Sequence, residues 1–524
     1  MCNAKKPSFS VKSLTTLIGL TVCISAPSYA QEKSYLDSIK ENVSGLIKPK
    51  EDDSFKTAQM QKLSDFSFEP DARINEFPVV TLPNSVVGQK ASLNNIFVEE
   101  QKVVNLPKNG NATQNRILSL NEAVQIAVKR NPTIAQSIAT LASQNSNIDV
   151  AKAGYYPQLK AGMNTGDFTS SDRGRQVYTV EASQLLFDFG KVKSSVDTQK
   201  SKLVLEQANV LTSIDKISAD TSRAILSLLR YRALVQIAED QVKGVGRLYE
   251  IARLRAEAGI SSNADPVQAK SYVEYSKSYL IAQQNLLKQS EQQLRTLLGF
   301  DVSRVDFVIP DDLVNHSGLY NELELNGIPS MIAAKAEIDV AQGQKKQTEL
   351  SRYPTISLVG SVNKALNGIN PNNGKEDGTN SAISVSMTSN FYQGGAVGSQ
   401  VKAAGFAEQA ARSKLNATYL EILDSTRTAR ENIENTDKQI WVLLDRERST
   451  AKTRELYEEQ YKLGKRSILD LLSSEQSYHS SRAEREAARY DIYNTIAVFI
   501  NVTGKSREVY HLNNTEIQGF EVQP

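Results

Sequence analysis

The strongest constraint on the fold of this 524-residue chain is an internal repeat. Two segments of nearly 200 residues carry the same landmarks in the same order: an X-Pro step, a Tyr-Pro turn 25 residues later, a Phe-x-x-Gly run, and a glycine 69 or 70 residues beyond that run. In the first segment these are Pro132, Pro157, Phe187–Gly190 and Gly259, and in the second Pro329, Pro354, Phe391–Gly394 and Gly464. The repeat predicts one structural unit built twice, at 116–310 and 311–505, with a tail at 506–524.

Long helices are expected to dominate each repeat. No proline occurs for more than 100 residues after Pro157 or after Pro371, and good helix formers fill these stretches. Residues 190–259 predict a helix of roughly 100 Å, at 1.5 Å per residue. Shorter helices at 119–156, broken at its internal proline, and at 262–298 would cover about the same length if they lay end to end. The apolar stripes favour coiled-coil packing, but an ordinary helical bundle would show the same periodicity.

Between the first short helix and the long helix of each repeat, the apolar period changes from 3.6 to 2. Apolar residues alternate with polar ones in four segments, at Leu159, Ala161 and Met163; Tyr178, Val180 and Ala182; Ile356, Leu358 and Val362; and Ile383, Val385 and Met387. This alternation fits the strands of a transmembrane β-barrel, and it equally fits two hairpins packed on helices. A membrane barrel needs at least about eight strands, so a barrel would require several copies of this chain.

The first 30 residues have the pattern of a signal peptide. A basic start with three lysines precedes the short apolar run Leu14–Ile24, and Ser28-Tyr29-Ala30 predicts cleavage after Ala30. No later stretch reaches about 18 consecutive apolar residues, so an exported chain in the outer membrane would have to use β-strands. Residues 31–115 are polar and contain five prolines, which predicts an irregular N-terminal arm.

No set of residues for catalysis, metal binding or cofactor binding is visible. Cleavage would remove both cysteines, Cys2 and Cys23, and Val22 before Cys23 argues against lipidation. The histidines His316, His479 and His511 have no ligand-like spacing, and no phosphate-binding loop occurs. The 61 basic and 59 acidic residues nearly cancel, which argues against a nucleic-acid partner. We therefore expect a protein that is not an enzyme, without cofactors or metal.

The order and duplication of several motifs resemble the TolC family of outer-membrane efflux proteins. These motifs are Asn131-Pro132, the paired Tyr-Pro turns, Leu186–Gly190 and the paired Gly-x-x-x-x-x-Asp turns. The resemblance covers roughly 117–505. It implies a mostly α-helical homotrimer in the cell outer membrane, with a twelve-stranded β-barrel on a long helical tunnel in the periplasm. It also implies a periplasmic adaptor and an inner-membrane pump, either an ABC transporter or a proton-driven pump, as partners.

The two turns after the long helices are the candidate functional site. Each begins with a glycine, Gly259 or Gly464, and reaches an aspartate six residues later, Asp265 or Asp470. The glycine can simply end a helix and the aspartate can simply cap the next one.

The resemblance implies a second reading of these turns, as a periplasmic gate. In it Asp470 forms an acidic ring, and Tyr461 and Arg466 link neighbouring helices, with Asp265 as their partner. A second aspartate of the family's ring falls at Ser473 here, so the ring would be weaker. The same turns would dock the adaptor through Gly259, Ile260, Leu463, Gly464, Lys465 and Ile468, of which Ile260, Leu463 and Ile468 are expected to be exposed apolar residues.

These expectations lead to a passive exit duct. The run Phe187–Val192 and the absence of a lipidation signal favour the branch that exports type I secreted proteins, such as large adhesins. Small-molecule or drug efflux is the alternative cargo. A periplasmic coiled-coil scaffold without a barrel is the alternative of another class.

Overall fold

The computed structural model describes residues 116–522, apart from 167–174, 311–312, 367–369 and 371–373. The described helices and strands all belong to one unit, Val79–Pro524. The expected signal peptide (1–30) and the arm (31–115) lie outside the described residues.

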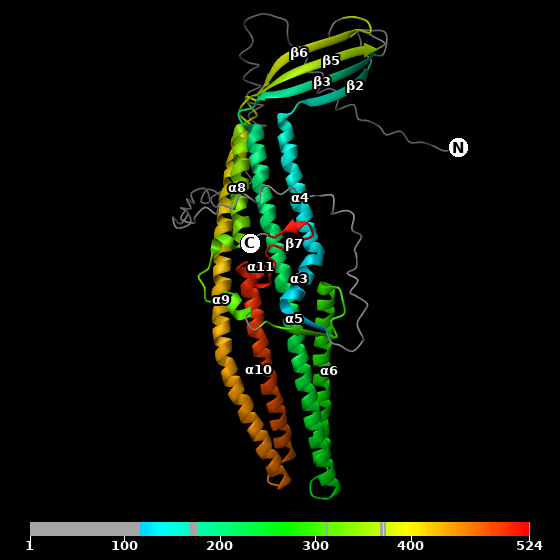
Figure 1. Cartoon of the computed structure of the whole chain (residues 1–524), viewed down its shortest axis with the longest axis vertical. Helices are drawn as coiled ribbons and strands as arrows, with labels where there is room; N and C mark the ends of the chain where they lie inside the picture. The colour runs from blue at the N-terminus through cyan, green and yellow to red at the C-terminus, as the bar shows by residue number, and fades with distance from the viewer. Residues whose placement is uncertain (1–115, 167–174, 311–312, 367–369, 371–373, 523–524) are drawn as a thin grey trace, which may run out of the picture. The chain divides into compact units, whose positions relative to one another are not determined.

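The first repeat alternates helices and strands in the expected order (Figure 1). Its elements are β1 (Arg116–Ser119), α3 (Leu120–Arg130), α4 (Pro132–Lys152), η5 (Ala153–Tyr155), β2 (Gln158–Gly166), β3 (Arg175–Phe187), α5 (Lys191–Glu257) and α6 (Ala264–Leu298). A capping box starts α3: the hydroxyl of Ser119 accepts the N–H of Glu122 at 3.2 Å, and the Glu122 carboxylate accepts the N–H of Ser119 at 3.0 Å. Asn131 separates α3 from α4, because Pro132 begins a new helix at its first position.

The second repeat reproduces this order. Its elements are β4 (Val305–Val308), α7 (Leu313–His316), η6 (Leu325–Gly327), α8 (Pro329–Leu350), β5 (Thr355–Leu366), β6 (Thr379–Thr388), α9 (Ala396–Lys462) and α10 (Ile468–Val502), followed by α11 (Ser506–Val509), β7 (Glu516–Ile517) and β8 (Phe520–Glu521). The long helices α5 and α9 have 67 residues each, and α6 and α10 have 35 each. The predicted repeat of helix lengths is therefore confirmed.

The helices form one open layer. The long helix α5 packs against α4 and α6 on one side and against α8 and α10 on the other, while α9 packs only against α8 and α10. The shorter helices of each pair follow one another along the long ones (Figure 1). The layer thus has α4 and α6 at one edge and α9 at the other. No described helix is both long and apolar enough to cross a membrane.

The two hairpins form one antiparallel sheet of order β2-β3-β5-β6, with β2 and β6 at its edges. Its register pairs Met163 with Tyr178, Val180 with Val362, and Leu358 with Val385. The predicted period of two is confirmed, because the apolar residues of all four strands fall on the same face. Many of them are exposed, among them Leu159, Met163, Val180, Ile383, Val385 and Met387. The sheet therefore presents a continuous apolar face that this chain does not cover.

The segment expected as a C-terminal tail is packed into the main core as far as Val522. Tyr510, Leu512 and Ile517 are buried in the same cluster as residues of α3 and α5. The side-chain amide of Gln518 donates to the carbonyls of Lys129, at 3.0 Å, and Asn131, at 3.1 Å. These bonds satisfy carbonyls at the break between α3 and α4, where the helix itself leaves them without partners.

Candidate functional site

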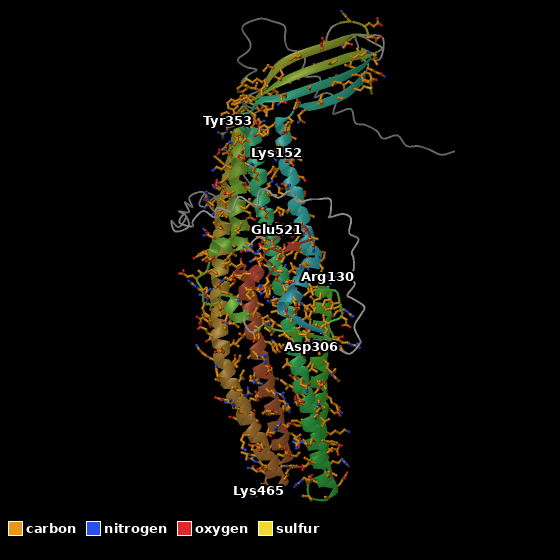
Figure 2. All side chains as sticks on the ribbon, viewed as in Figure 1. Arg130, Lys152, Asp306, Tyr353, Lys465 and Glu521 are labelled. Carbon is orange, nitrogen blue, oxygen red and sulfur yellow. The ribbon has the colours of Figure 1, made fainter. Side chains whose placement is uncertain are left out.

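The candidate site comprises the α5–α6 turn (258–263, the first tip) and the α9–α10 turn (463–467, the second tip). Each tip follows the far end of a long helix that begins at the sheet. Figure 2 shows Lys465 at the end of the helices opposite Tyr353, which lies beside the sheet. Among the described residues no group of three or more His, Cys, Asp or Glu side chains could hold a metal ion.

A glycine in left-handed conformation closes the first tip. Gly259 has φ +71°, and its N–H donates to the Ala256 carbonyl at 3.0 Å. The N–H of Ile260 reaches back to the Arg255 carbonyl at 2.9 Å. This pair of bonds is a Schellman motif, in which glycine is favoured because a side chain strains the positive φ.

The second tip has the same geometry. Gly464 has φ +73°, its N–H donates to the Tyr461 carbonyl at 3.0 Å, and the N–H of Lys465 donates to the Gln460 carbonyl at 2.9 Å. The helix-ending role expected for both glycines is therefore confirmed. A side chain added at either position would meet no neighbour within 4 Å, so the backbone conformation alone explains the glycines.

Neither aspartate is the residue that caps its helix. Ser467 caps α10 by accepting the N–H of Asp470 at 3.2 Å, which places Asp470 at the third position of the helix. Asp265 lies in the first turn of α6, behind Asn263 at the N-cap position. Both carboxylates lie in a first turn, where the partial positive charge of a helix N-terminus stabilises an anion.

An apolar cluster beneath the tips joins both hairpins of helices. It contains Val245, Leu248 and Ala252 of α5, Ala269 of α6, Tyr461 of α9, and Ile468, Leu471 and Leu472 of α10. The expectation that Ile468 is exposed is wrong, since only 2% of it is accessible. As the first residue of α10 it lies three and four positions before Leu471 and Leu472, on the same inward helix face.

The other two predicted apolar residues are exposed. Ile260 is 64% and Leu463 69% accessible. Leu469, which was not predicted, is also exposed, because it follows Ile468 on the opposite face of the helix. Lys465 is exposed between the two hairpin helices. The apolar side chains available for a partner at the second tip are therefore Leu463 and Leu469.

All the contacts of Arg466 lie within its own hairpin. Its guanidinium is 3.6 Å from the Asp470 carboxylate, its Nε donates to Gln460 Oε1 at 3.0 Å, and it covers the Tyr457 ring at 4.4 Å. In the part of the chain that the structure describes, no ion pair within 4.0 Å joins Arg466 to Asp265, the partner that the resemblance implies. Half-exposed pairs such as Arg466–Asp470 contribute at most about 1 kcal/mol.

Arg255 makes the connection between the two hairpins that was expected of Arg466. Its guanidinium lies 4.9 Å from the centre of the Tyr461 ring, and its Nη1 donates to the Lys462 carbonyl at 3.2 Å. The structure also brings Tyr461 near Asp265. Burial raises the pKa of Tyr461, the Asp265 charge raises it further, and Arg255 opposes both. The Tyr461 hydroxyl is buried without a hydrogen-bond partner among the described residues.

Comparisons with known proteins agree with this architecture. A family model described as outer membrane efflux protein matches residues 123–300 and 320–505. Outer membrane protein TolC of Salmonella enteritidis is 22% identical over 408 residues, covering 74% of this chain and 82% of that protein. Outer membrane efflux protein BepC of Brucella suis is 21% identical over 395 residues, covering 74% and 85%.

Solved structures share the fold. The outer membrane protein VceC of Vibrio cholerae superposes with a TM-score of 0.64 at 17% identity, covering 74% of this chain and 96% of that one. The outer membrane channel CmeC of Campylobacter jejuni gives 0.64 at 13% identity, covering 74% and 86%. At these identities the likeness concerns the fold alone.

Proposed function

Since the chain belongs to the outer membrane efflux protein family, we propose that it is the exit-duct subunit of a tripartite export system. It lies in the cell outer membrane and extends into the periplasm. The observation that carries the proposal is that both the sheet and the helical layer end in unpaired edges within one chain.

The open edges support assembly into a closed ring. An exposed strand edge leaves backbone N–H and C=O groups without partners, which is costly in a membrane, so β6 of one copy would pair with β2 of the next. Four strands are too few for a membrane barrel. Three copies, the number that the family resemblance implies, would give a twelve-stranded barrel.

The exposed side chains support the same arrangement. The apolar face of the sheet would meet outer-membrane lipid, and its polar face would line the duct. Along the edge helix α9, Phe406, Leu420, Trp441 and Val442 are exposed. We propose that α4 and α6 of the next copy cover them, since α4 and α6 form the opposite edge of the layer.

The tips would form the periplasmic gate and the docking surface for a periplasmic adaptor. Asp265, Tyr461, Arg466 and Asp470 would control the mouth, with Arg255 added to them. Exposed Ile260, Leu463 and Lys465, which flank Gly259 and Gly464, would contact the adaptor. An inner-membrane ABC transporter would supply the energy, and a proton-driven pump is the alternative.

For the cargo we favour a type I secreted protein, such as a large adhesin, on the strength of the run Phe187–Val192. Small-molecule efflux is the second candidate, since a relative at 21% identity is named an efflux protein. Deleting the gene separates them. Retention of a large surface protein inside the cell, with unchanged drug sensitivity, would support secretion; the converse would support efflux.

Assembly and location test the duct itself. We expect the mature chain to fractionate with the outer membrane, to migrate on gels as a heat-dissociable oligomer, and to give a mass of three chains in detergent. A soluble periplasmic monomer would contradict the proposal and favour the coiled-coil scaffold without a barrel.

A further inference from the structure

We propose that a charge clamp above the tips holds the two helical hairpins of one chain together and must open when the mouth widens. The clamp consists of Arg247 on α5, Arg454 and Glu458 on α9, and Glu475 and His479 on α10. It rests on the proposed duct function, but none of its members belongs to the gate residues at the tips. It is a second level of control, on the sheet side of the apolar tip cluster.

The pair Arg247–Glu458 connects the two repeats directly. The two guanidinium nitrogens of Arg247 lie 2.6 and 2.8 Å from the two carboxylate oxygens of Glu458. This is the two-point geometry in which arginine binds carboxylate most strongly. Glu458 is largely buried, and the hydrogen bond from Arg247 lowers its pKa to about 2, with Lys462 contributing. The helices α5 and α9 lie on opposite sides of α10, so this bond spans the interface between the hairpins.

Glu475 forms the inner half of the clamp. Its side chain is 3% exposed, with Oε1 at 3.1 Å from His479 Nε2 and Oε2 at 3.7 Å from Arg454 Nε. A methyl group added at Gly244 of α5 would overlap this carboxylate. Glycine at position 244 therefore lets α5 approach α10 closely enough to enclose Glu475.

The charges alternate across the three helices. Arg454 and Glu458 are one turn apart on α9, so one faces Glu475 on α10 while the other faces Arg247 on α5. The charge of Glu475 also raises the pKa of Arg247. If the hairpins separated, two largely buried carboxylates would lose the arginines that compensate them, and an unpaired buried charge is costly. The clamp therefore favours the arrangement of helices seen in this structure.

Conductance of the purified assembly in planar bilayers tests the clamp. Arg247→Ala should raise the open fraction about fivefold, the effect of losing about 1 kcal/mol from a partly exposed pair. The reversed pair Arg247→Glu with Glu458→Arg should return within twofold of the wild type. Arg253→Ala is the matched control, because both partners of Arg253 lie on its own helix. An Arg247→Ala channel identical to the Arg253→Ala channel would overturn the clamp.

A second measurement separates the clamp from the duct. In a double-mutant cycle on thermal unfolding, Arg247→Ala and Glu458→Ala should be non-additive, and Glu475→Gln, which keeps the side-chain shape, should weaken their coupling. A wild type that forms no channels would refute the duct proposal, while coupling in the cycle would still support a tie between the hairpins. Additive single changes would refute the clamp whether or not channels form.

Discussion

The helices α5 and α9 have the same length and the same place in their repeats, but their surroundings differ. Twenty-three residues of α5 are buried, against six of α9. Of the large apolar residues of α5 only Leu254 is markedly exposed, whereas α9 exposes five. The difference arises because α5 has neighbours on both sides and α9 on one side only. A duplicated sequence has thus produced one central helix and one edge helix, and the edge helix carries the surface for the next copy.

The contrast is sharpest where the repeats align. Counted back from the tip glycines, Asp215 on α5 corresponds to Leu420 on α9. Asp215 is 2% exposed, and Leu420 is 60% exposed. The central helix buries a carboxyl group near the C-terminal segment, while the edge helix exposes a leucine. Both choices are unfavourable for an isolated chain, and each leads to a prediction.

The largest expected effect is at Asp215. Burial raises its pKa to about 7, and Arg507 and Ser506 offset only part of that shift. The folded state therefore keeps the proton over a range in which the unfolded state, with a pKa near 3.8, has lost it. Stability should be full below about pH 4 and should fall as the pH rises to about 7, by up to about 4 kcal/mol.

Asp215→Asn should remove this pH dependence and raise the melting temperature at pH 8. Thermal unfolding between pH 4 and pH 8 measures it. The control is Asp220→Asn, on the same helix, for which we expect no change. A wild type whose melting temperature rises with pH would show that Asp215 is ionised in the folded state.

The second prediction concerns the exposed edge. Trp441 on α9 is 66% exposed, and covering its remaining surface in an assembly would contribute about 3 kcal/mol per copy. Trp441→Ser should therefore dissociate the oligomer, as measured by mass in detergent, while each chain stays helical. The matched change Leu254→Ser on the central helix should leave the assembly intact. If both changes behave alike, α9 is not the assembly edge.

The repeat, the helix lengths and the period of the strands were predictable because they depend on local features. Missing prolines, tip glycines and alternating residues act within a few positions of one another. The burial of Ile468 was not predictable, because the first residue of a helix has no orientation until its neighbours are placed. The contacts of Arg255 with Tyr461 and of Arg247 with Glu458 join residues some 200 positions apart, and charged residues at such separations carry no pairing signal in one sequence.

The third prediction addresses the place where α5 and α9 end together. The Tyr461 hydroxyl is buried without a partner within one chain, a situation that costs about 1 kcal/mol or more. Tyr461→Phe should then stabilise the tip by about 1 kcal/mol and lower the open fraction of the channel. The family resemblance implies the opposite, a hydroxyl that holds the mouth closed. Conductance of this variant beside Tyr457→Phe decides between them, since an increase for Tyr461→Phe alone would reveal a partner supplied by assembly.

The smallest expected effect distinguishes the two tips. In the resemblance Asp470 forms a ring at the duct mouth, and three carboxylates facing a narrow pore attract cations. Arg466 lies 3.6 Å from Asp470, so part of that charge is already neutralised, and Ser473 supplies none. We therefore expect Asp470→Asn to reduce cation selectivity only about twofold, by the loss of a partly screened charge. Asp265→Asn, after the central helix, should change it less, because that charge faces Tyr461. Reversal potentials in a salt gradient measure both. Equal losses at the two positions would place both aspartates in the pore, and the edge hairpin would no longer be the one that sets selectivity.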